Sequence, residues 1–384
     1  MKKRIIETVH ARNQVIDNII DALQSKNHFL MLGHRNPDED CIASMVAFAL
    51  IVSKFSKKAT VCLRARVHEH FQYLLNICRH NGIRCSAHID DGGDSIDALV
   101  LCDTPKPSMI DADPAAARLI DDPSILKIEI DHHLGADSSY FGDEGYRLVT
   151  EANSASELVG LIALKLAKRE DLLTQYHIAN LLSRNIVLAV LTGIVGDTNM
   201  GRFIKSKRQK RYYDLFSDLY NSMLEGNTTK ITNLTNKEQV FLEIQRLSAK
   251  EDRCFSYILD RKKSSPSIGY AVLTREDMAR LSKEFDEETI VSVSRSITDR
   301  LAEESRKLGM VAYDDSARTG LVQFRLRRGH AFKSFDLRRI LELFSISDGG
   351  GHEGAIGFRI EASRVGDVAV FVEGLVEGIE KAIA

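Results

Sequence analysis

The sequence predicts an α/β domain with a parallel sheet and helices on both faces, followed by a smaller α+β domain with a mixed sheet. Its 384 residues exceed what one hydrophobic core usually organises. Between residues 29 and 131, short apolar runs alternate with helical stretches, which is typical of a parallel sheet. Later strands follow a less regular order. We therefore expect domains at residues 1–235 and 253–384, joined by a linker region at residues 236–252.

The predicted elements of the first domain begin with a helix. Apolar residues recur at helical spacing up to Leu23, so we expect an amphipathic helix within residues 1–27. Four apolar runs follow as predicted strands: FLMLG, ATVCL, DALVLCD and LKIEID. Helices are predicted over residues 41–56, 68–81, 154–168 and 171–195, the last of these containing the strongly apolar NIVLAVLTGIV.

In the second domain, SIGYAVLT, GMVAYDD, GLVQFRLR and AIGFRI supply four strands, and residues 335–345 are a predicted helix. Before it lie a basic run, KSKRQK, and a segment rich in Thr and Asn, NTTKITNLTN, which is typical of a loop or linker.

Composition limits the classes of partner and compartment. Lys and Arg number 52 against 54 acidic residues, so the net charge of -2 favours a small anionic substrate over long nucleic acid. Six scattered cysteines without a C-x-x-C pair favour a reducing cytoplasm. The first 26 residues carry too many charges for a secretory signal, and no apolar run is long enough to span a bilayer. We expect a cytoplasmic protein without a membrane partner.

Acidic residues and histidines cluster where predicted strands and helices end. Loops beyond the C-terminal ends of parallel strands converge on one edge of the sheet. Neighbouring buried carboxylates repel each other unless a cation lies between them. Carboxylate and imidazole ligands suit Mn²⁺, Mg²⁺ or Fe²⁺ better than a thiolate-rich zinc site. The candidate residues are His34, Asp38, Asp40, Asp103, Asp131, His132, His133 and Asp197.

Each of these loops also has a structural interpretation. Asp38 or Asp40 can cap a helix, and Asp103 can form a simple turn. The Asp131–His133 run can be a polar strand end, and Asp197 can terminate its helix. Taken alone, each loop leaves both interpretations open, whereas their recurrence at the same kind of position favours a metal site.

Three consecutive glycines, Gly349, Gly350 and Gly351, allow close approach of backbone N–H groups to a phosphate and form a candidate anion-binding nest beside His352. A tight turn between a helix and the AIGFRI strand is the alternative.

These motifs resemble, in order, the four motifs of the DHH family: H-x-x-x-D-x-D at residues 34–40, a strand-end Asp103, Asp131-His132-His133 and TGIVGDT around Asp197. DGGGHEGAIG at residues 348–357 resembles the glycine-histidine motif of the accessory DHHA1 domain. The resemblance covers Phe29 to about residue 360 and disfavours the DHHA2 pyrophosphatase branch.

The resemblance implies a ligand set for two divalent ions, expected to be Mn²⁺, with Mg²⁺ or Fe²⁺ as alternatives. One ion would be held by His34, Asp38 and Asp103, and the other by Asp40, Asp103, His132 and Asp197. Asp103 would bridge the two. His133 would contact the phosphate or assist proton transfer, and Asp131 would orient a histidine.

The implied activity is hydrolysis of short oligonucleotides, or of nucleotide phosphomonoesters such as 3′-phosphoadenosine 5′-phosphate, by a metal-bridging hydroxide in a cleft between the domains. Arg327 would clamp phosphate together with Gly349–Gly351 and His352. Soluble cyclic dinucleotide phosphodiesterase is the alternative enzyme. A nucleotide-binding regulator that has lost turnover is the alternative of another class.

Three residues depart from the family pattern: Glu39 inside Asp-x-Asp, Asp348 before the glycines, and Arg325 where a serine often occurs. They leave the predicted metal ligands intact. The family's rules of substrate recognition, however, do not carry over directly to this chain. The N-terminal helix and residues 205–236 could either mediate dimerisation or cover the cleft. A homodimer is therefore one expected state.

Overall fold

The computed structural model describes residues 2–64, 67, 69–89, 95–135, 138–204, 206–224, 237–244 and 247–383. The chain divides into two compact units, Met1–Arg246 and Leu247–Ala384. The predicted loop at residues 227–236 lies outside the described residues, as does Lys205 of the basic run.

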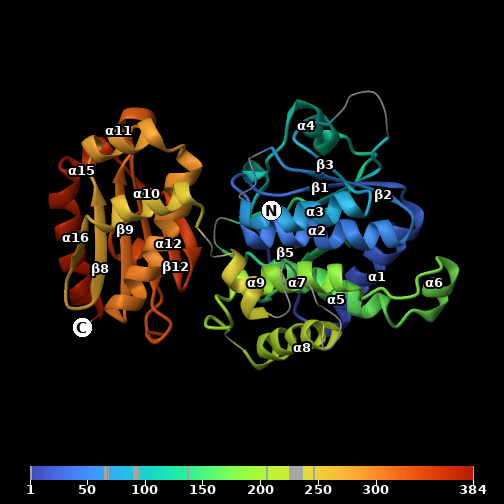
Figure 1. Cartoon of the computed structure of the whole chain (residues 1–384). Helices are drawn as coiled ribbons and strands as arrows, with labels where there is room; N and C mark the ends of the chain where they lie inside the picture. The colour runs from blue at the N-terminus through green and yellow to red at the C-terminus, as the bar shows by residue number, and fades with distance from the viewer. Residues whose placement is uncertain are drawn as a thin grey trace. The chain divides into compact units, whose positions relative to one another are not determined.

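The first unit is built on a six-stranded sheet in the order β3-β2-β1-β4-β5-β6, and all neighbouring strands are parallel (Figure 1). The strands are β1 (His28–Leu32), β2 (Lys58–Cys62), β3 (Arg84–Ser86), β4 (Ala98–Cys102), β5 (Leu126–Asp131) and β6 (Arg147–Val149). The predicted parallel sheet is therefore confirmed, and two short edge strands, β3 and β6, are added to it.

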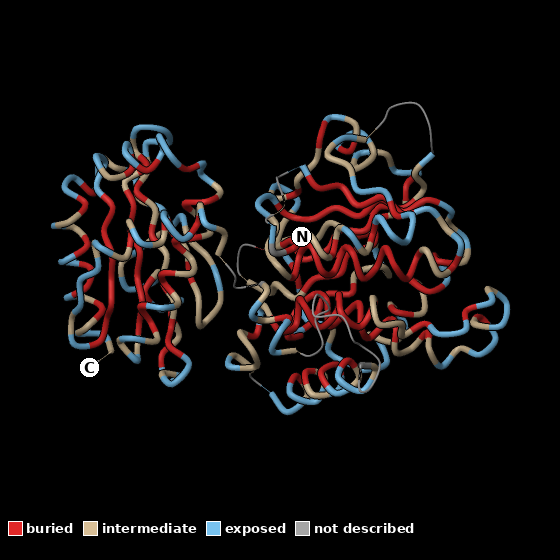
Figure 2. Tube along the Cα trace, viewed as in Figure 1, coloured by how far each residue is buried: buried red, intermediate tan, exposed pale blue. Residues whose placement is uncertain are grey.

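Hydrophobic cores lie on both faces of this sheet. Side chains of a strand alternate between faces, so Phe29 and Met31 join the larger core, while Leu30 and Leu32 join the smaller one. This two-sided burial explains why these strands are continuous apolar runs (Figure 2).

Helices pack against both cores. The larger core includes residues of α1 (Val9–Ser25), α2 (Glu39–Lys54), α3 (Gln72–His80), α5 (Ala155–Leu166), α6 (Glu170–Gln175), α7 (Arg184–Asp197), α8 (Lys207–Leu224) and α9 (Lys237–Ile244). The smaller core includes Ala116 of α4 (Pro114–Asp121). Short 3₁₀ turns span Glu69–Phe71 and Pro107–Met109.

The N-terminal helix is shorter than predicted, because it begins at Val9 after an N-cap at Thr8. The residues before it are extended: Lys2 forms a β-bridge with Ser139, and the Lys3 side chain is buried. The buried ammonium group of Lys3 pairs with carboxylates that lie far away in the sequence. This pairing keeps the segment extended instead of helical.

The predicted helix over residues 171–195 is wrong in one respect. The chain forms two helices, α6 and α7, separated by residues 176–183. His177 between them has a left-handed φ of 53°, which no continuous helix accommodates. Asp197 is the last residue of α7 rather than part of the turn after it.

The second unit contains a six-stranded sheet in the order β11-β12-β10-β9-β8-β7. Strands β8 and β9 are parallel and the other neighbours are antiparallel, which confirms the predicted mixed sheet. The strands are β7 (Lys262–Ser264), β8 (Ile268–Leu273), β9 (Leu308–Asp314), β10 (Leu321–Arg328), β11 (Gly349–His352) and β12 (Ala355–Glu361).

One face of this sheet carries a core that includes α16 (Val368–Ile383), and the other carries a core that includes α10 (Ala249–Leu259), α11 (Arg275–Glu284) and α12 (Glu287–Ser305). Three shorter helices complete the unit: α13 (Ser316–Thr319), α14 (Arg338–Leu343) and α15 (Ala362–Val365).

The predicted linker region at residues 236–252 contains helical segments. Helix α9 covers Lys237–Ile244, and α10 starts inside the region with a capping box between Ser248 and Glu251. Within the described ranges, no helix combines the length and apolarity needed to cross a bilayer.

Candidate metal and catalytic site

The loop after β1 places His34 and Asp38 at the C-terminal edge of the first sheet. Asp38 is the N-cap of α2, and its Oδ1 accepts a hydrogen bond from Cys41 N at 3.3 Å. The same Oδ1 lies 3.6 Å from His34 Nε2. The capping interpretation of the sequence is therefore realised, and it does not exclude a ligand role, because a carboxylate oxygen has more than one lone pair.

Asp103 follows β4 and lies between two histidines. Its Oδ2 is 3.8 Å from His34 Nε2, and its Oδ1 is 3.3 Å from His132 Nε2. The residue is buried and has a left-handed φ of 49°, a conformation that aspartate tolerates better than most residues. Each oxygen thus faces a different histidine, which is the arrangement expected of a bridging carboxylate.

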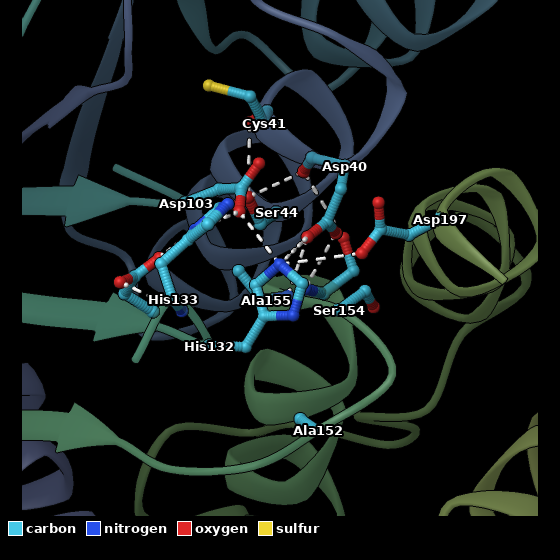
Figure 3. A network of polar contacts seen from close by, with 12 residues as sticks. Asp40, Cys41, Ser44, Asp103, His132, His133, Ala152, Ser154, Ala155 and Asp197 are labelled. Carbon is cyan, nitrogen blue, oxygen red and sulfur yellow. Dashed lines mark hydrogen bonds and ion pairs between the residues drawn. The ribbon is translucent and has the colours of Figure 1, made fainter. Parts of the chain in front are cut away.

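His132, directly after β5, is the centre of the second group of carboxylates (Figure 3). Besides Asp103, its Nε2 lies 3.4 Å from Asp197 Oδ2 and 3.9 Å from Asp40 Oδ2. These atoms come from the ends of β4, β5 and α7 and from the first turn of α2. The structure thus brings together the six predicted metal ligands, which come from four separate stretches of the sequence: residues 34–40, Asp103, His132 and Asp197.

Asp40 is held from behind by the N-terminus of α5. Its Oδ2 accepts a hydrogen bond from Ala155 N at 2.6 Å, and its Oδ1 accepts one from Ser156 N at 2.9 Å. Helix N-termini favour negative charge. These two bonds fix the position of the Asp40 carboxylate, whose Oδ2 lies 3.9 Å from His132 Nε2.

Asp131, the last residue of β5, contacts His133 on one side and Lys3 on the other. Its Oδ1 is 2.8 Å from His133 Nδ1, and its Oδ2 is 2.6 Å from Lys3 Nζ. Lys3 Nζ also lies 2.8 Å from Glu129 Oε1, and the side chains of Lys3, Glu129 and Asp131 are fully buried. Asp131 is therefore placed to orient His133.

The pKa values of this site show how strongly its charges interact. Burial raises the pKa of Asp40 well above its usual range, and the neighbouring Asp103 and Asp197 raise it further. Desolvation by the surrounding protein likewise raises the pKa of Asp197 to about 6, although 32% of its side-chain surface stays exposed. Burial alone would lower the pKa of His132, but Asp103 and Asp197 outweigh it and raise that pKa well above its ordinary value.

Asp131 behaves in the opposite way. Burial would raise its pKa, but His133 and Lys3 outweigh burial and hold the pKa of this carboxyl well below its usual range. Asp131 therefore stays ionised. The carboxylates of Asp40 and Asp197 instead repel neighbouring carboxylates, which favours their protonated forms. The two kinds of aspartate differ because only Asp131 has a permanent cation beside it.

Two residues of the site escaped the sequence analysis. Lys3 lies more than a hundred positions from Asp131 and Glu129 in the sequence. Only its position in a charged N-terminal segment could have drawn attention to it. Cys41 Sγ lies within 4.8 Å of ligand atoms of His34 and Asp103. Burial raises the pKa of the Cys41 thiol to about 11.

The predicted substrate residues belong to the second unit. Gly349, Gly350 and Gly351 form the edge strand β11 together with His352, and Gly351 has a φ of 139°. Arg359 N donates to Asp348 O at 2.8 Å, so by the alternation of an antiparallel pair the N–H groups of Gly349 and Gly351 point to the edge away from β12. The glycines thus offer donors along a strand rather than within a turn.

Comparison with known proteins finds a family model that matches part of the first unit. The sequence model described as the DHH family, N-terminal domain, matches residues 28–194. No curated protein matches the sequence. Among solved structures, an exopolyphosphatase-related protein from Bacteroides fragilis is 16% identical, with 97% of each chain covered and a TM-score of 0.63. That likeness extends the fold comparison to both units.

Two further structures are more distant. RecJ in complex with Mn²⁺ from Thermus thermophilus is 12% identical with a TM-score of 0.45, and the match covers 99% of this chain and 55% of that one. The pGpG-specific phosphodiesterase PggH from Vibrio cholerae is 15% identical with a TM-score of 0.36, and the match covers 91% and 98%. The matched residues 28–194 carry five of the six clustered ligands, so this part of the chain is similar to the N-terminal domain of the DHH family.

Proposed function

We propose that the chain is a metal-dependent phosphoesterase that uses two divalent ions to hydrolyse short oligonucleotides or nucleotide phosphomonoesters. The observation that carries the proposal is the position of Asp103, whose two oxygens each face a different histidine, with Asp38 on one side and Asp40 and Asp197 on the other.

The residues fit a pair of cations. Asp103 Oδ1 is buried and, among the described residues, has no hydrogen bond of acceptable geometry. The raised pKa values of Asp40 and Asp197 reflect repulsion and burial that bound cations would relieve. His34, Asp38 and Asp103 would hold one ion, and Asp40, Asp103, His132 and Asp197 the other. Their oxygen and imidazole ligands favour Mn²⁺, with Mg²⁺ or Fe²⁺ as alternatives.

When bound, two such ions would acidify the attacking water and neutralise charge that develops on the phosphate. The chain's own contribution is orientation and proton transfer. Asp131 stays ionised and accepts the Nδ1–H of His133. His133 Nε2 would then contact the phosphate and transfer protons there. Asp40, fixed by the N–H groups of Ala155 and Ser156, keeps its side of the site rigid.

The proposed substrate class rests on charge and on the intact ligand set. A net charge of -2 lacks the basic excess of a protein that tracks long nucleic acid. A regulator that had lost turnover would be expected to lose ligands first, and the six clustered here favour an enzyme. Cyclic dinucleotides remain the alternative substrate.

The test is hydrolysis with Mn²⁺ across linear di- to pentanucleotides, cyclic dinucleotides and 3′-phosphoadenosine 5′-phosphate. Asp103→Asn removes the bridging charge, and Asp121→Asn, at an exposed acid at the end of α4, is the matched control. We expect turnover of linear or monoester substrates that Asp103→Asn abolishes and Asp121→Asn retains. Turnover restricted to cyclic dinucleotides would establish the alternative, and no turnover of any substrate would refute the enzyme proposal.

A further inference from the structure

The extended segment at residues 2–4 is bonded to a loop that follows the two histidines of the site. Lys2 forms a β-bridge with Ser139. Arg4 N donates to the Tyr140 hydroxyl at 2.8 Å, and that hydroxyl donates to Arg4 O at 3.1 Å. The N-terminal segment is therefore held against the first unit by its backbone as well as by its side chains.

The loop that contains Ser139 is also bonded to the loop of Asp103. Ser139 N donates to Pro105 O at 3.0 Å, and Asp103 N donates to Ile130 O at 3.0 Å. Three stretches that are far apart in the sequence thus meet here: the N-terminal segment, the loop of Asp103, and β5 with the chain that follows it.

The ammonium group of Lys3 lies at this meeting point. Its Nζ donates to Thr104 O at 2.8 Å and to Asp131 Oδ2 at 2.6 Å, and it lies 2.8 Å from Glu129 Oε1. An ammonium group has three N–H donors, so three oxygens match its capacity. Thr104 and the side chains of the other three residues are buried. A buried charge is stable only when it is well paired, so the position of this group is specific.

Two partners of Lys3 are direct neighbours of predicted metal ligands. Thr104 follows Asp103, and Asp131 precedes His132. Asp103 Oδ1 and His132 Nε2 are 3.3 Å apart and come from these two separate strand ends (Figure 3). One ammonium group therefore joins the backbone beside the bridging carboxylate to the strand end that carries the histidines.

We propose that Lys3 is a positioning residue of the metal site, which locks the loop of Asp103 to the end of β5. The inference rests on the proposed function, because the position of these ligands affects turnover only if ions bind to them. Lys3 acts through Thr104, Asp131 and Glu129 rather than on an ion. Residues that support metal ligands in this way typically change metal affinity by roughly 10- to 100-fold when they are lost.

Charge and position predict opposite effects of removing this ammonium group. Lys3→Met removes a positive charge near a cation site, so Coulomb attraction alone predicts tighter binding of Mn²⁺. A positioning role predicts weaker binding, because the two strand ends are no longer held together. Lys3→Met combined with Glu129→Gln keeps the net charge of the buried group unchanged and still removes the bonds of the ammonium group.

Hydrogen exchange of the full chain in EDTA measures the locking without any metal. In Lys3→Met and in the double variant, we expect the amides of Asp103 and Ser139 to exchange about tenfold or more faster, beyond any increase shared with the amides of α7. Calorimetric titration should show Mn²⁺ affinity lowered by roughly 10- to 100-fold in both variants.

Two controls separate this role from a general loss of stability. Lys2→Met changes an exposed side chain of the same segment. Gly160→Ala overpacks the core, because its Cβ would lie 2.4 Å from Phe216 Cζ. Both controls should keep the wild-type Mn²⁺ affinity. The double variant leaves one buried carboxylate fewer without its cation, so it stays informative if Lys3→Met does not fold.

Mn²⁺ binding that is unchanged or tighter in the double variant, or exchange that rises equally throughout the first unit, would overturn the positioning role. Local loosening in the variants together with a wild type that hydrolyses no substrate would keep the positioning role and remove the proposed function. Hydrolysis by the wild type, with exchange at Asp103 and Ser139 unchanged in both variants, would do the reverse.

Discussion

Gly193 of α7 lies directly behind the ligand Asp40, so adding one methyl group there should disturb the metal site. A Cβ at this position would lie 2.1 Å from Ser156 Oγ and 2.3 Å from Asp40 Oδ1. Ordinary contacts are about 3.5–4.0 Å, so atoms must move by roughly 1 Å or more. Asp40 is tied to the N–H groups of Ala155 and Ser156 and cannot rotate away without losing them.

For Gly193→Ala we expect two effects. Overpacking should lower the free energy of unfolding by about 1–3 kcal/mol. Displacing Asp40 by more than about 0.5 Å should weaken Mn²⁺ binding by roughly 10- to 100-fold. Calorimetric titration with Mn²⁺ measures the affinity, and thermal unfolding in EDTA measures the stability.

Gly160→Ala is the matched control, because it overpacks the same unit away from the ligands. Its Cβ would meet Phe216 Cζ at 2.4 Å in the core between α5 and α8. Its unfolding free energy should fall while Mn²⁺ affinity is kept. Unchanged Mn²⁺ affinity in Gly193→Ala, or an equal loss in Gly160→Ala, would refute the reasoning.

Three further predictions follow from single contacts. Lys3→Met should leave Asp131 and Glu129 as buried carboxylates without their cation. The free energy of unfolding should therefore fall by about 3–5 kcal/mol. Chemical denaturation measures this, and an effect no larger than that of Lys2→Met would contradict it. Burial raises the pKa of Asp197 to about 6, so the folded, metal-free chain keeps a proton that the unfolded chain releases near pH 4. This group's contribution to stability should be full below about pH 4 and lost as pH rises through about 6. Melting in EDTA of the wild type against Asp197→Asn detects it, and a difference that is flat with pH would argue against it. Ser248→Ala removes the capping-box hydroxyl of α10 and should cost about 1 kcal/mol, seen in denaturant unfolding, with no change in Mn²⁺ affinity.

The parts of the fold that the sequence predicted depend on local patterns. Strands β1, β4 and β5 are apolar runs because both faces of the sheet are covered. Such a run can be recognised from the residues of the strand itself. The ligands were identifiable because each lies at the end of such a run or of an apolar helix, where no packing requirement explains a charge. Asp103 and His132 are the clearest cases.

The parts that the sequence did not predict depend on distant contacts or on single backbone conformations. Residues 2–8 have helical periodicity, yet Lys3 is drawn to Asp131 and Glu129, which no local pattern reveals. The break between α6 and α7 depends on the left-handed His177. The glycines 349–351 permit either a turn or a strand, and pairing with β12 decides in favour of β11.

The pairing of Arg327 with Asp299, and the absence of any such partner for Arg325 among the described residues, likewise required the structure, because α12 and β10 are separate in sequence. The sequence alone identified Arg325 only as a departure from a family pattern.

The most direct test of the paired-metal site is the number of Mn²⁺ ions bound per chain, measured by equilibrium dialysis and elemental analysis in the wild type and in Asp103→Asn. Because Asp103 Oδ1 and Oδ2 face His132 and His34 respectively, we predict two ions in the wild type and fewer in the variant. A wild type that binds no Mn²⁺, or an Asp103→Asn variant that binds two ions with unchanged affinity, would contradict the account.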